Sequence, residues 1–327
     1  MQVTPQNQVN EGKWREFAPF PHPTWELEGV ESQGNIYLIG GITNAWAARA
    51  GWIPNRLVYA YDPKGDQWIR KASIPAGIHH MALAEVDGMI YGFGGYQTPD
   101  HGPDAWEPVA KAWRYDPLAD TWTALAPLPA ARGAAAAAAI NGRIYIAGGS
   151  FALNRRGDVV AQPAAPHGSS AQVFVYDPVT DAYDEAAPLL TARNHHLLES
   201  VCGKLYALGG RVGSSNAFTL TNRIDLVEEY DPADDTWWPK ARMLAPHGGM
   251  VSCVHNDAIY VSGGDGIRMI EKYDPSADQW TVAAQLPRPR LGGSGGCVDG
   301  RFHVITGHVR TADGSEPVPD HIALELD

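Results

Sequence analysis

Cysteines, long apolar runs and leader-like segments are scarce in this sequence. Only three cysteines, Cys202, Cys253 and Cys297, occur among 327 residues. A small odd number gives no disulfide framework, and because these cysteines lie in or beside expected inner strands, we expect small buried thiols. No apolar run approaches a membrane span, and the stretch from Met1 to Glu11 lacks the apolar core of a secretory signal. The sequence therefore predicts a soluble, cytoplasmic protein.

Positive charge is also in short supply. Lys and Arg total 25 against 37 Asp and Glu, which gives a formal net charge of -12. A duplex nucleic-acid binder needs a basic footprint, and anionic membrane surfaces attract basic segments, so we expect neither as a partner. The sequence also lacks a Walker phosphate loop, a dinucleotide fingerprint, a zinc-type CxxC pair and a Gly-x-Ser-x-Gly elbow.

What the sequence does contain is a repeat. A tight turn, a short apolar strand with an aromatic residue and closing glycines recur, and the last glycines are Gly41, Gly95, Gly149, Gly210, Gly264 and Gly307. Five copies continue to a Tyr-Asp-Pro and then to an aromatic residue, as in Tyr115 to Pro117 followed by Trp122. A period of about 50 residues with several short strands per unit is typical of a β-propeller.

This pattern resembles the Kelch-repeat family from Trp14 to Asp327. The resemblance implies an all-β, six-bladed Kelch β-propeller as a single domain over residues 13–327, after a tail of residues 1–12. The segment from Lys13 to Pro21 matches the end of each later repeat, whereas the last repeat stops without it. We therefore expect the N-terminal strand to complete the last blade, which leaves no open sheet edge.

The Kelch family does not imply one activity. It includes actin-binding and adaptor proteins, sugar mutarotases, plant specifier proteins and a copper oxidase, and at the level of the fold this chain is similar to bacterial sialic-acid mutarotases. Function must therefore be argued from a site. We interpret the recurring Tyr-Asp-Pro aspartates as turn caps and the recurring tryptophans as packing residues between blades.

The alanine run at residues 134–139 presents a conflict. Intrinsic propensity favours a helix, but its place in the repeat predicts an innermost strand from Arg132 to Ile140, where small side chains let six blades meet at an axis. Tertiary context overrides propensity, so we predict a strand.

The candidate site lies at one mouth of the central channel. In an up-and-down blade, the connections from the second to the third strand share one face of the propeller. These connections are long at 42–58, 96–113, 150–173, 211–227 and 308–321, and only 265–270 is short. Long connections in compact domains are often functional, so we expect a ligand beneath them.

Basic side chains are expected to converge on this mouth. Aligned on the glycines, Arg132, Arg193, His247 and Arg290 are equivalent, at the entrance to each first strand. The arginine fork suits a carboxylate or phosphate, so we predict a small anionic ligand, with further contacts from Asn194, Trp46, Tyr96 and Arg211. The alternative for each arginine is structural, because the Kelch consensus places arginine there to bond carbonyls of neighbouring blades.

Histidines supply the candidate acid–base groups. Histidine can act as a general acid or base near neutral pH, and we expect this role for His79, His80 and His195, with Glu26 or Glu199 as partner. Adjacent strand residues point to opposite faces, so we expect at most one of His79 and His80 to face the mouth. Packing or hydrogen-bonding roles remain the alternative for each histidine.

Three functions follow from these residues. The first is a binder or enzyme of isomerase, mutarotase or lyase type, acting on a small anionic molecule without a cofactor. The second is a protein-interaction module that uses the same loops. The third is a metal-dependent enzyme with a transition metal held by His80, His195 and His247.

Overall fold

The computed structural model describes residues 12–43, 54–98, 106–152, 167–213, 222–264, 266–311 and 314–326. Trp46 of the predicted ligand set and nearly all of the predicted N-terminal tail lie outside these ranges. The described residues form strands and turns, and none belongs to a helix long and apolar enough to cross a membrane.

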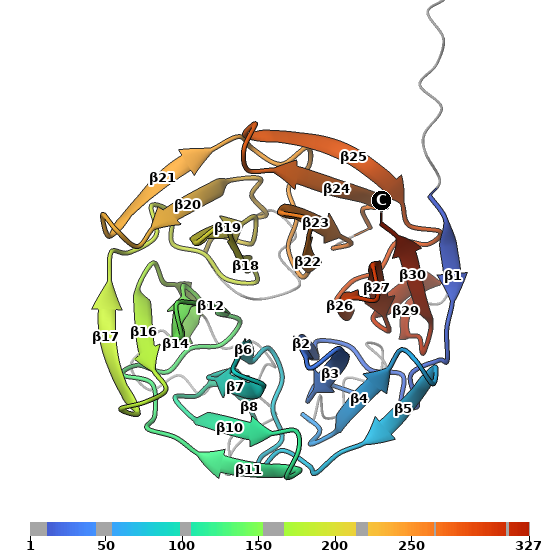
Figure 1. Ribbon diagram of the computed structural model, residues 1–327, viewed down its shortest axis with the longest axis horizontal. Coiled ribbons are helices and arrows are strands. Elements are labelled where there is room, and N and C mark those ends of the chain that lie inside the picture. The colour runs from blue at the N-terminus through green and yellow to red at the C-terminus, as the bar shows by residue number, and fades with distance from the viewer. Residues whose placement is uncertain are drawn as a thin grey trace, which may run out of the picture.

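Six four-stranded antiparallel sheets surround one axis, each with its first strand innermost (Figure 1). Blade one contains β2 (Glu28–Ser32), β3 (Asn35–Ile39), β4 (Val58–Asp62) and β5 (Gln67–Arg70). Blade two contains β6 (Ala82–Val86), β7 (Met89–Phe93), β10 (Ala112–Asp116) and β11 (Thr121–Ala124). Blade three contains β12 (Ala136–Ile140), β13 (Arg143–Ala147), β16 (Val173–Asp177) and β17 (Ala182–Ala186).

The remaining blades follow the same order. Blade four contains β18 (Leu197–Val201), β19 (Lys204–Leu208), β20 (Val227–Asp231) and β21 (Thr236–Lys240). Blade five contains β22 (Val251–His255), β23 (Ala258–Ser262), β24 (Met269–Asp274) and β25 (Gln279–Gln285). Blade six contains β26 (Ser294–Val298), β27 (Arg301–Ile305), β30 (His321–Glu325) and β1 (Trp14–Glu16).

The N-terminal strand closes the ring, as the sequence predicts. β1 pairs antiparallel with β30, and Trp14 lies opposite Leu324. The indole Nε1 of Trp14 also donates to the carbonyl of Gln285 in blade five, at 2.9 Å. Both ends of the chain therefore stabilise the same blade, and its sheet has no unpaired outer edge at β30.

The repeated tryptophans and aspartates are structural, as expected. Trp122 Nε1 donates to the Ala72 carbonyl of the preceding blade at 2.9 Å, and Trp237 donates to Ala187 at 2.8 Å. In the turns, a carboxylate oxygen of Asp62 accepts from the backbone N–H of Lys64 at 3.0 Å. The alanine run also forms the predicted inner strand, but β12 begins at Ala136 rather than at Arg132.

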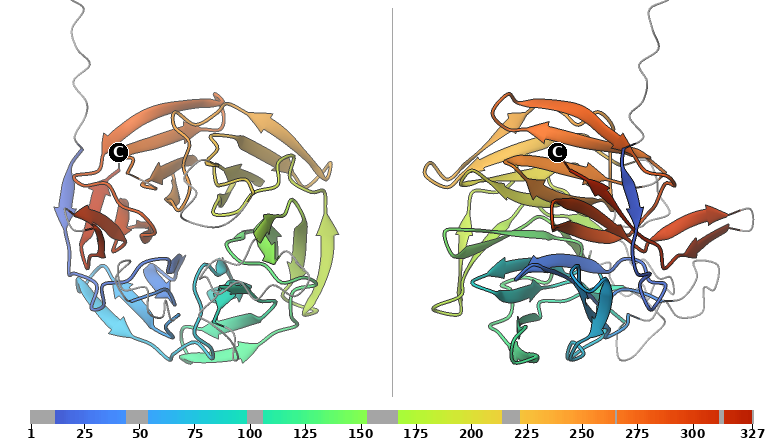
Figure 2. Two further views of the ribbon diagram at one scale, coloured as in Figure 1. Left: turned by 180° about the vertical axis from the view of Figure 1, so that it is seen from behind. Right: turned by 45° about the vertical axis from the view of Figure 1, so that its right-hand side comes forward.

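Three further hairpins extend the connections between second and third strands. They are β8 (Tyr96–Gln97) with β9 (Glu107–Pro108), β14 (Ser150–Ala152) with β15 (His167–Ser169), and β28 (His308–Thr311) with β29 (Gly314–Pro317). The hairpin β28–β29, red in Figure 2, projects from the body of the propeller. These hairpins lie in the connections for which the sequence predicts a site.

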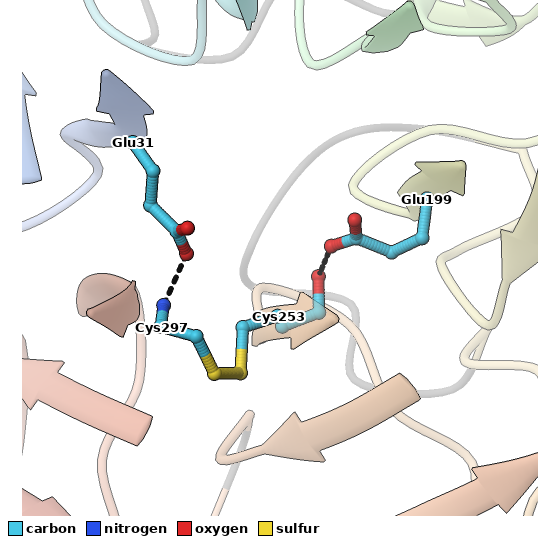
Figure 3. The surroundings of a disulfide bond; sticks show 5 residues. Glu31, Glu199, Cys253 and Cys297 are labelled. Atoms are coloured by element: carbon cyan, nitrogen blue, oxygen red, sulfur yellow. Dashed lines mark hydrogen bonds between the residues drawn. A yellow bond between two sulfur atoms is a disulfide. The ribbon is translucent and has the colours of Figure 1, made fainter. Parts of the chain in front are cut away.

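A disulfide joins blades five and six. Cys253 of β22 and Cys297 of β26 are bonded, with their Cα atoms 5.4 Å apart (Figure 3). The expectation of buried thiols is therefore wrong for this pair, because inner strands of adjacent blades approach at the axis although the cysteines are 44 positions apart in sequence. Cys202 is free and exposed, in the turn between β18 and β19.

Candidate functional site

Six equivalent residues form a ring at the entrance to the inner strands. Glu26, His80, Ala134, His195, Gly249 and Gly292, here called the axial ring, all have φ between 50° and 68°. Backbone N–H groups of this ring donate to carbonyls of the ring residue one blade earlier, for example Ala134 to His80 at 3.1 Å and His195 to Ala134 at 3.0 Å. The left-handed turn delays the start of each inner strand, which explains the late start of β12.

The fold needs only a small residue at these ring positions, and blades three, five and six have Ala134, Gly249 and Gly292. The other three blades have a glutamate and two histidines, and all three side chains are buried. Left-handed backbone costs an L-residue about 1–2 kcal/mol, and burial of an ionisable group adds a further cost. The fold therefore does not require Glu26, His80 and His195 at these positions, and their presence indicates a functional role.

Glu26 and His80 form a buried pair. His80 Nε2 lies 2.8 Å from Glu26 Oε2, and both side chains are at most 5% exposed. Burial raises the pKa of Glu26, but the charge and hydrogen bond of His80, with the charges of Arg211 and His308, hold this pKa below its usual value. Glu26 is therefore a carboxylate near neutral pH and lies within ion-pair distance of Nε2 of His80.

His79 lies against the same pair. Its Nδ1 is 2.5 Å from Nδ1 of His80, so one proton serves both nitrogens. The two adjacent rings approach each other because the left-handed turn at His80 breaks the alternation of an extended strand, and of the two only His80 lines the channel cavity. Burial, followed by the charge of His80, holds the pKa of His79 well below its usual value.

One ring nitrogen of His195, Nε2, is unprotonated. Its Nδ1 lies 2.6 Å from Oδ1 of Asn194, whose own Nδ2 donates to Ser169 Oγ at 2.7 Å and to the Gly213 carbonyl at 3.2 Å. This arrangement makes Asn194 the acceptor and places the His195 proton on Nδ1. The Nε2 of His195 therefore carries a lone pair, and it is buried without a hydrogen-bond partner among the described residues.

The pKa of His195 is held well below its usual value. Burial is the main cause, and the charges of Arg211, His80, His79 and His167 act in the same direction. The ring centroids of His80 and His195 are 4.7 Å apart. A neutral imidazole and a carboxylate-bound imidazole therefore lie close enough for one small molecule to contact both.

Aromatic rings surround these groups. Trp106 lies 4.5 Å from His79 between ring centroids, and Tyr96 stacks on His167 at 5.4 Å. Tyr96 also hydrogen-bonds to Ser150. On the other side, Trp25 lies 4.3 Å from His308. Of these residues, the prediction named only Tyr96 as a ligand contact; Trp25, His167 and His308 have no counterpart in the repeat that marks them in sequence.

Arg211 is the predicted arginine that belongs to this cluster. A Cβ added at Gly248 would lie 3.0 Å from its Cγ and Nε. Its charge lowers the pKa of both Glu26 and His195. The structure thus brings together Glu26, His79, His80, His195, Asn194, Tyr96 and Arg211 from the predicted set.

The other arginines do not form the predicted ring of guanidinium groups. Arg193 is fully buried, and it donates to the carbonyls of Gly209 at 3.0 Å and Leu226 at 2.9 Å and pairs with Glu228. Arg132 donates to the Ala131 carbonyl at 2.9 Å and to Gln172. The structural alternative applies to both, but the partners belong to each arginine's own blade rather than to a neighbouring one.

Arg290 and His247 also bind partners within their own blades. Arg290 donates to the Thr306 carbonyl at 3.1 Å and pairs with Asp320 at 3.2 Å. His247 lies 2.8 Å from the Gly263 carbonyl and 2.6 Å from Glu271 Oε1. Both ring nitrogens of His247 are thus engaged away from His80 and His195, and within the described ranges no three His, Cys, Asp or Glu residues are grouped to hold a metal.

The central channel encloses a cavity of about 380 Å³ whose wall includes Glu26, His80 and His195 at the ring end. Further along lie Glu31, which accepts from the backbone N–H of Cys297, and Glu199, which accepts from Ser252 (Figure 3). Glu199 therefore does not pair with a histidine. Burial raises the pKa of Glu28 to about 8 and that of Glu31 and Glu199 to about 7. Of these glutamates only Glu199 was named from the sequence, as a partner of a histidine, because no motif marks Glu28 or Glu31.

Comparison with known proteins supports the repeat assignment. The Kelch motif model matches residues 78–129, 131–190, 192–243 and 246–287. Kelch-like protein terF of Aspergillus terreus is 28% identical over 270 residues, which cover 79% of this chain and 54% of that protein. Kelch-like protein 36 of Bos taurus is 28% identical over 71% of this chain and 34% of its own length. The chain thus spans about half of the first relative and about a third of the second.

A solved structure agrees at the level of the fold. The structure of YjhT superimposes with a TM-score of 0.74 at 18% identity, covering 93% of this chain and 95% of that one.

Proposed function

This chain belongs to the Kelch-repeat family, and from that premise we propose that it binds a small anionic molecule at the axial ring and transfers protons to and from it. The observation that carries this proposal is the presence of Glu26, His80 and His195 at ring positions where alanine or glycine suffices in the other blades. A cytoplasmic location stays a prediction from the sequence.

The ring supplies a base and an acid. His195 Nε2 has a lone pair and lacks a donor among the described residues, so it accepts a proton from a ligand hydroxyl. A second ligand oxygen takes the proton that Nδ1 of His79 and Nδ1 of His80 share, and the carboxylate of Glu26 holds the His80 ring in place. In a mutarotase-type reaction, loss of the hydroxyl proton and protonation of the ring oxygen break one C–O bond and form a carbonyl, and the reverse steps close the ring on either face.

Arg211 gives the proposed site its preference for an anion. It lies beside the glycines of blade five, where no other ring side chain fills the space. A ligand carboxylate or phosphate near Arg211 would neutralise the guanidinium, as arginine does in ion pairs with oxyanions. Asn194 contacts His195, Tyr96 packs against His79, and both are fixed by their own hydrogen bonds.

The test is a thermal-shift screen against a collection of small organic acids and acidic sugars, followed by calorimetry on each hit. We expect His195→Ala and Glu26→Gln to weaken binding of a hit about tenfold or more, because a buried polar contact is lost. Turnover of a hit, followed by NMR, is expected to fall further in Glu26→Gln.

His22→Ala is the matched control, since His22 is exposed in the segment that leads to blade one. The proposal is wrong if every hit binds His195→Ala and Glu26→Gln as tightly as the unaltered protein. It is also wrong if the screen gives no hit.

A protein-interaction module is the second candidate function. The hairpin β28–β29 projects from the propeller (Figure 2). Arg310 and Glu316 on this hairpin are exposed. This role needs no proton transfer and leaves the buried histidines unexplained. A protein partner whose binding survives His195→Ala, together with an empty small-molecule screen, would favour it.

A further inference from the structure

A second cavity lies at the seam where the N-terminal strand closes the propeller. It has a volume of about 380 Å³ and is lined by Trp14, Arg15 and Phe17 of the N-terminal segment and by Arg288, Arg290 and Asp320. We call it the closure cavity. It is formed by residues of a different region from the axial ring, and its walls come from both ends of the chain.

Guanidinium groups outnumber carboxylates on its wall. Three arginines line it, against Glu16 and Asp320. Asp320 serves two of the arginines at once, because its Oδ2 pairs with both Arg288 and Arg290. His321 also lines it, and burial lowers the pKa of His321 to about 4, so this ring adds no charge near neutral pH. The wall itself thus carries one guanidinium more than carboxylates, and Arg15 also pairs with Glu325, which is not part of the wall, at 3.5 Å.

Arg290 is incompletely satisfied. Its side chain is 3% exposed, its Nη1 donates to the Thr306 carbonyl, and its Nη2 pairs with Asp320. Its Nε is buried and has no hydrogen-bond partner within the described part of the chain. An unpaired buried donor on a charged group is costly, and an oxyanion in the cavity would supply the missing acceptor.

The other two cations of the closure cavity, Arg15 and Arg288, are exposed. Arg15 and Arg288 are each 58% exposed, so they can reorient toward a ligand without leaving the protein surface. The ring of Phe17 lies 5.6 Å from the Arg15 guanidinium and limits how that group turns. One buried and two exposed guanidinium groups around one space suit the several oxygens of a phosphate or a carboxylate.

We propose that the closure cavity binds a small oxyanion, a phosphate or carboxylate group, between Arg15, Arg288 and Arg290. Because the cavity wall includes β1 and the start of β30, a bound anion links the N-terminal strand to the last two blades. Binding to the folded state alone raises its stability by RT ln(1 + [L]/Kd), so the gain grows with the logarithm of ligand concentration once the ligand exceeds its Kd. The closure cavity is thus a site at which an anion stabilises the closed ring.

The experiment measures the melting temperature and the heat of binding with inorganic phosphate and, separately, with malonate, each against sodium chloride of equal ionic strength. We expect phosphate, malonate or both to raise the melting temperature above the chloride value. Arg288→Gln is expected to weaken the binding about tenfold, since one charge-assisted hydrogen bond is removed. Asp320→Asn is expected to strengthen it, because the competing carboxylate is gone.

Arg143→Gln is the control, an exposed arginine of blade three that pairs with Asp177 and Asp184. A melting temperature that responds to phosphate and malonate no more than to chloride overturns the proposal, as does an equal response in Arg288→Gln and the unaltered protein. The part of the anion response that is lost in Arg288→Gln and kept in His195→Ala is the part assigned to the closure cavity, which separates this site from the axial ring.

Discussion

Two buried glutamates, Glu228 and Glu271, occupy matching places but neutralise different partners. Glu228 pairs with Arg193 and accepts from the backbone N–H of Leu190, and Glu271 pairs with His247 and accepts from Leu244. An arginine cannot lose its charge inside a protein, whereas a histidine can become neutral and keep a hydrogen bond. We therefore expect the protein to tolerate substitution of Glu271 better than substitution of Glu228.

We predict that Glu228→Gln destabilises the protein more than Glu271→Gln does. The first substitution leaves Arg193 as a buried, uncompensated charge, and the loss of one partner of a buried pair costs about 3–5 kcal/mol. The second leaves His247, which needs no charge to keep its hydrogen bond to the Gly263 carbonyl. Urea unfolding of the two variants provides the measurement, and equal losses would contradict the explanation.

Residue-level roles at the mouth were only partly predictable from sequence. The alignment placed Arg132, Arg193 and Arg290 at one level, which is correct, but it gave no direction for their side chains. These side chains turn back to carbonyls and carboxylates of their own blades. The ring residue two positions later, as in His195, lines the axial cavity and has a left-handed φ. A left-handed φ at glutamate, histidine or alanine leaves no sequence signal.

At the scale of elements, the sequence predicts strands and their order well. Turn pairs such as Asn141-Gly142 and the Tyr-Asp-Pro segments act locally, so each hairpin is specified by neighbours in the chain. Contacts between elements from different blades are not specified in this way. The bond between Cys253 and Cys297 joins β22 to β26 and depends on how closely two inner strands approach at the axis.

This disulfide leads to a prediction about β22 and β26. Cys253→Ser is expected to lower the free energy of unfolding by about 2–4 kcal/mol, because the cross-link restricts the unfolded chain. Cys202→Ser, at the exposed free cysteine, is expected to have no effect. Thiol titration of the denatured, unreduced protein should give one thiol from Cys202. Three thiols without a reductant, or equal stability of the two variants, would contradict the bond.

At the scale of the whole molecule, buried histidines and buried channel glutamates act on stability in opposite pH ranges. Burial lowers the pKa of His196 and His303 to about 3 and that of His308 to about 4. Unfolded histidine titrates near pH 6.5, so the unfolded chain binds these protons first. The stability associated with the neutral rings is present above about pH 6.5 and is lost as the pH falls toward the folded-state values.

The channel glutamates reverse this dependence. Their pKa values of about 8 for Glu28 and about 7 for Glu31 and Glu199 lie above that of an unfolded glutamate, near 4.3. Their contribution is present below about pH 4.3 and is lost as the pH rises to 7 and 8. Together, the two groups of residues give maximum stability between about pH 4.3 and about pH 6.5. In this range the channel glutamates of the folded protein are still largely protonated and its buried histidines are largely neutral.

Removal of the channel carboxylates should therefore move this maximum. In the triple variant Glu28→Gln, Glu31→Gln and Glu199→Gln, the loss of stability that these carboxylates cause above about pH 4.3 disappears, and we expect maximum stability at a higher pH than in the unaltered protein. Urea midpoints measured from pH 4.5 to 9 give the two curves, with Glu107→Gln, an exposed glutamate of β9, as control. Parallel curves would show that these carboxylates titrate alike in the folded and unfolded chains. A shifted maximum would show that the channel holds protonated glutamates at neutral pH, directly behind the ring that carries the ionised Glu26.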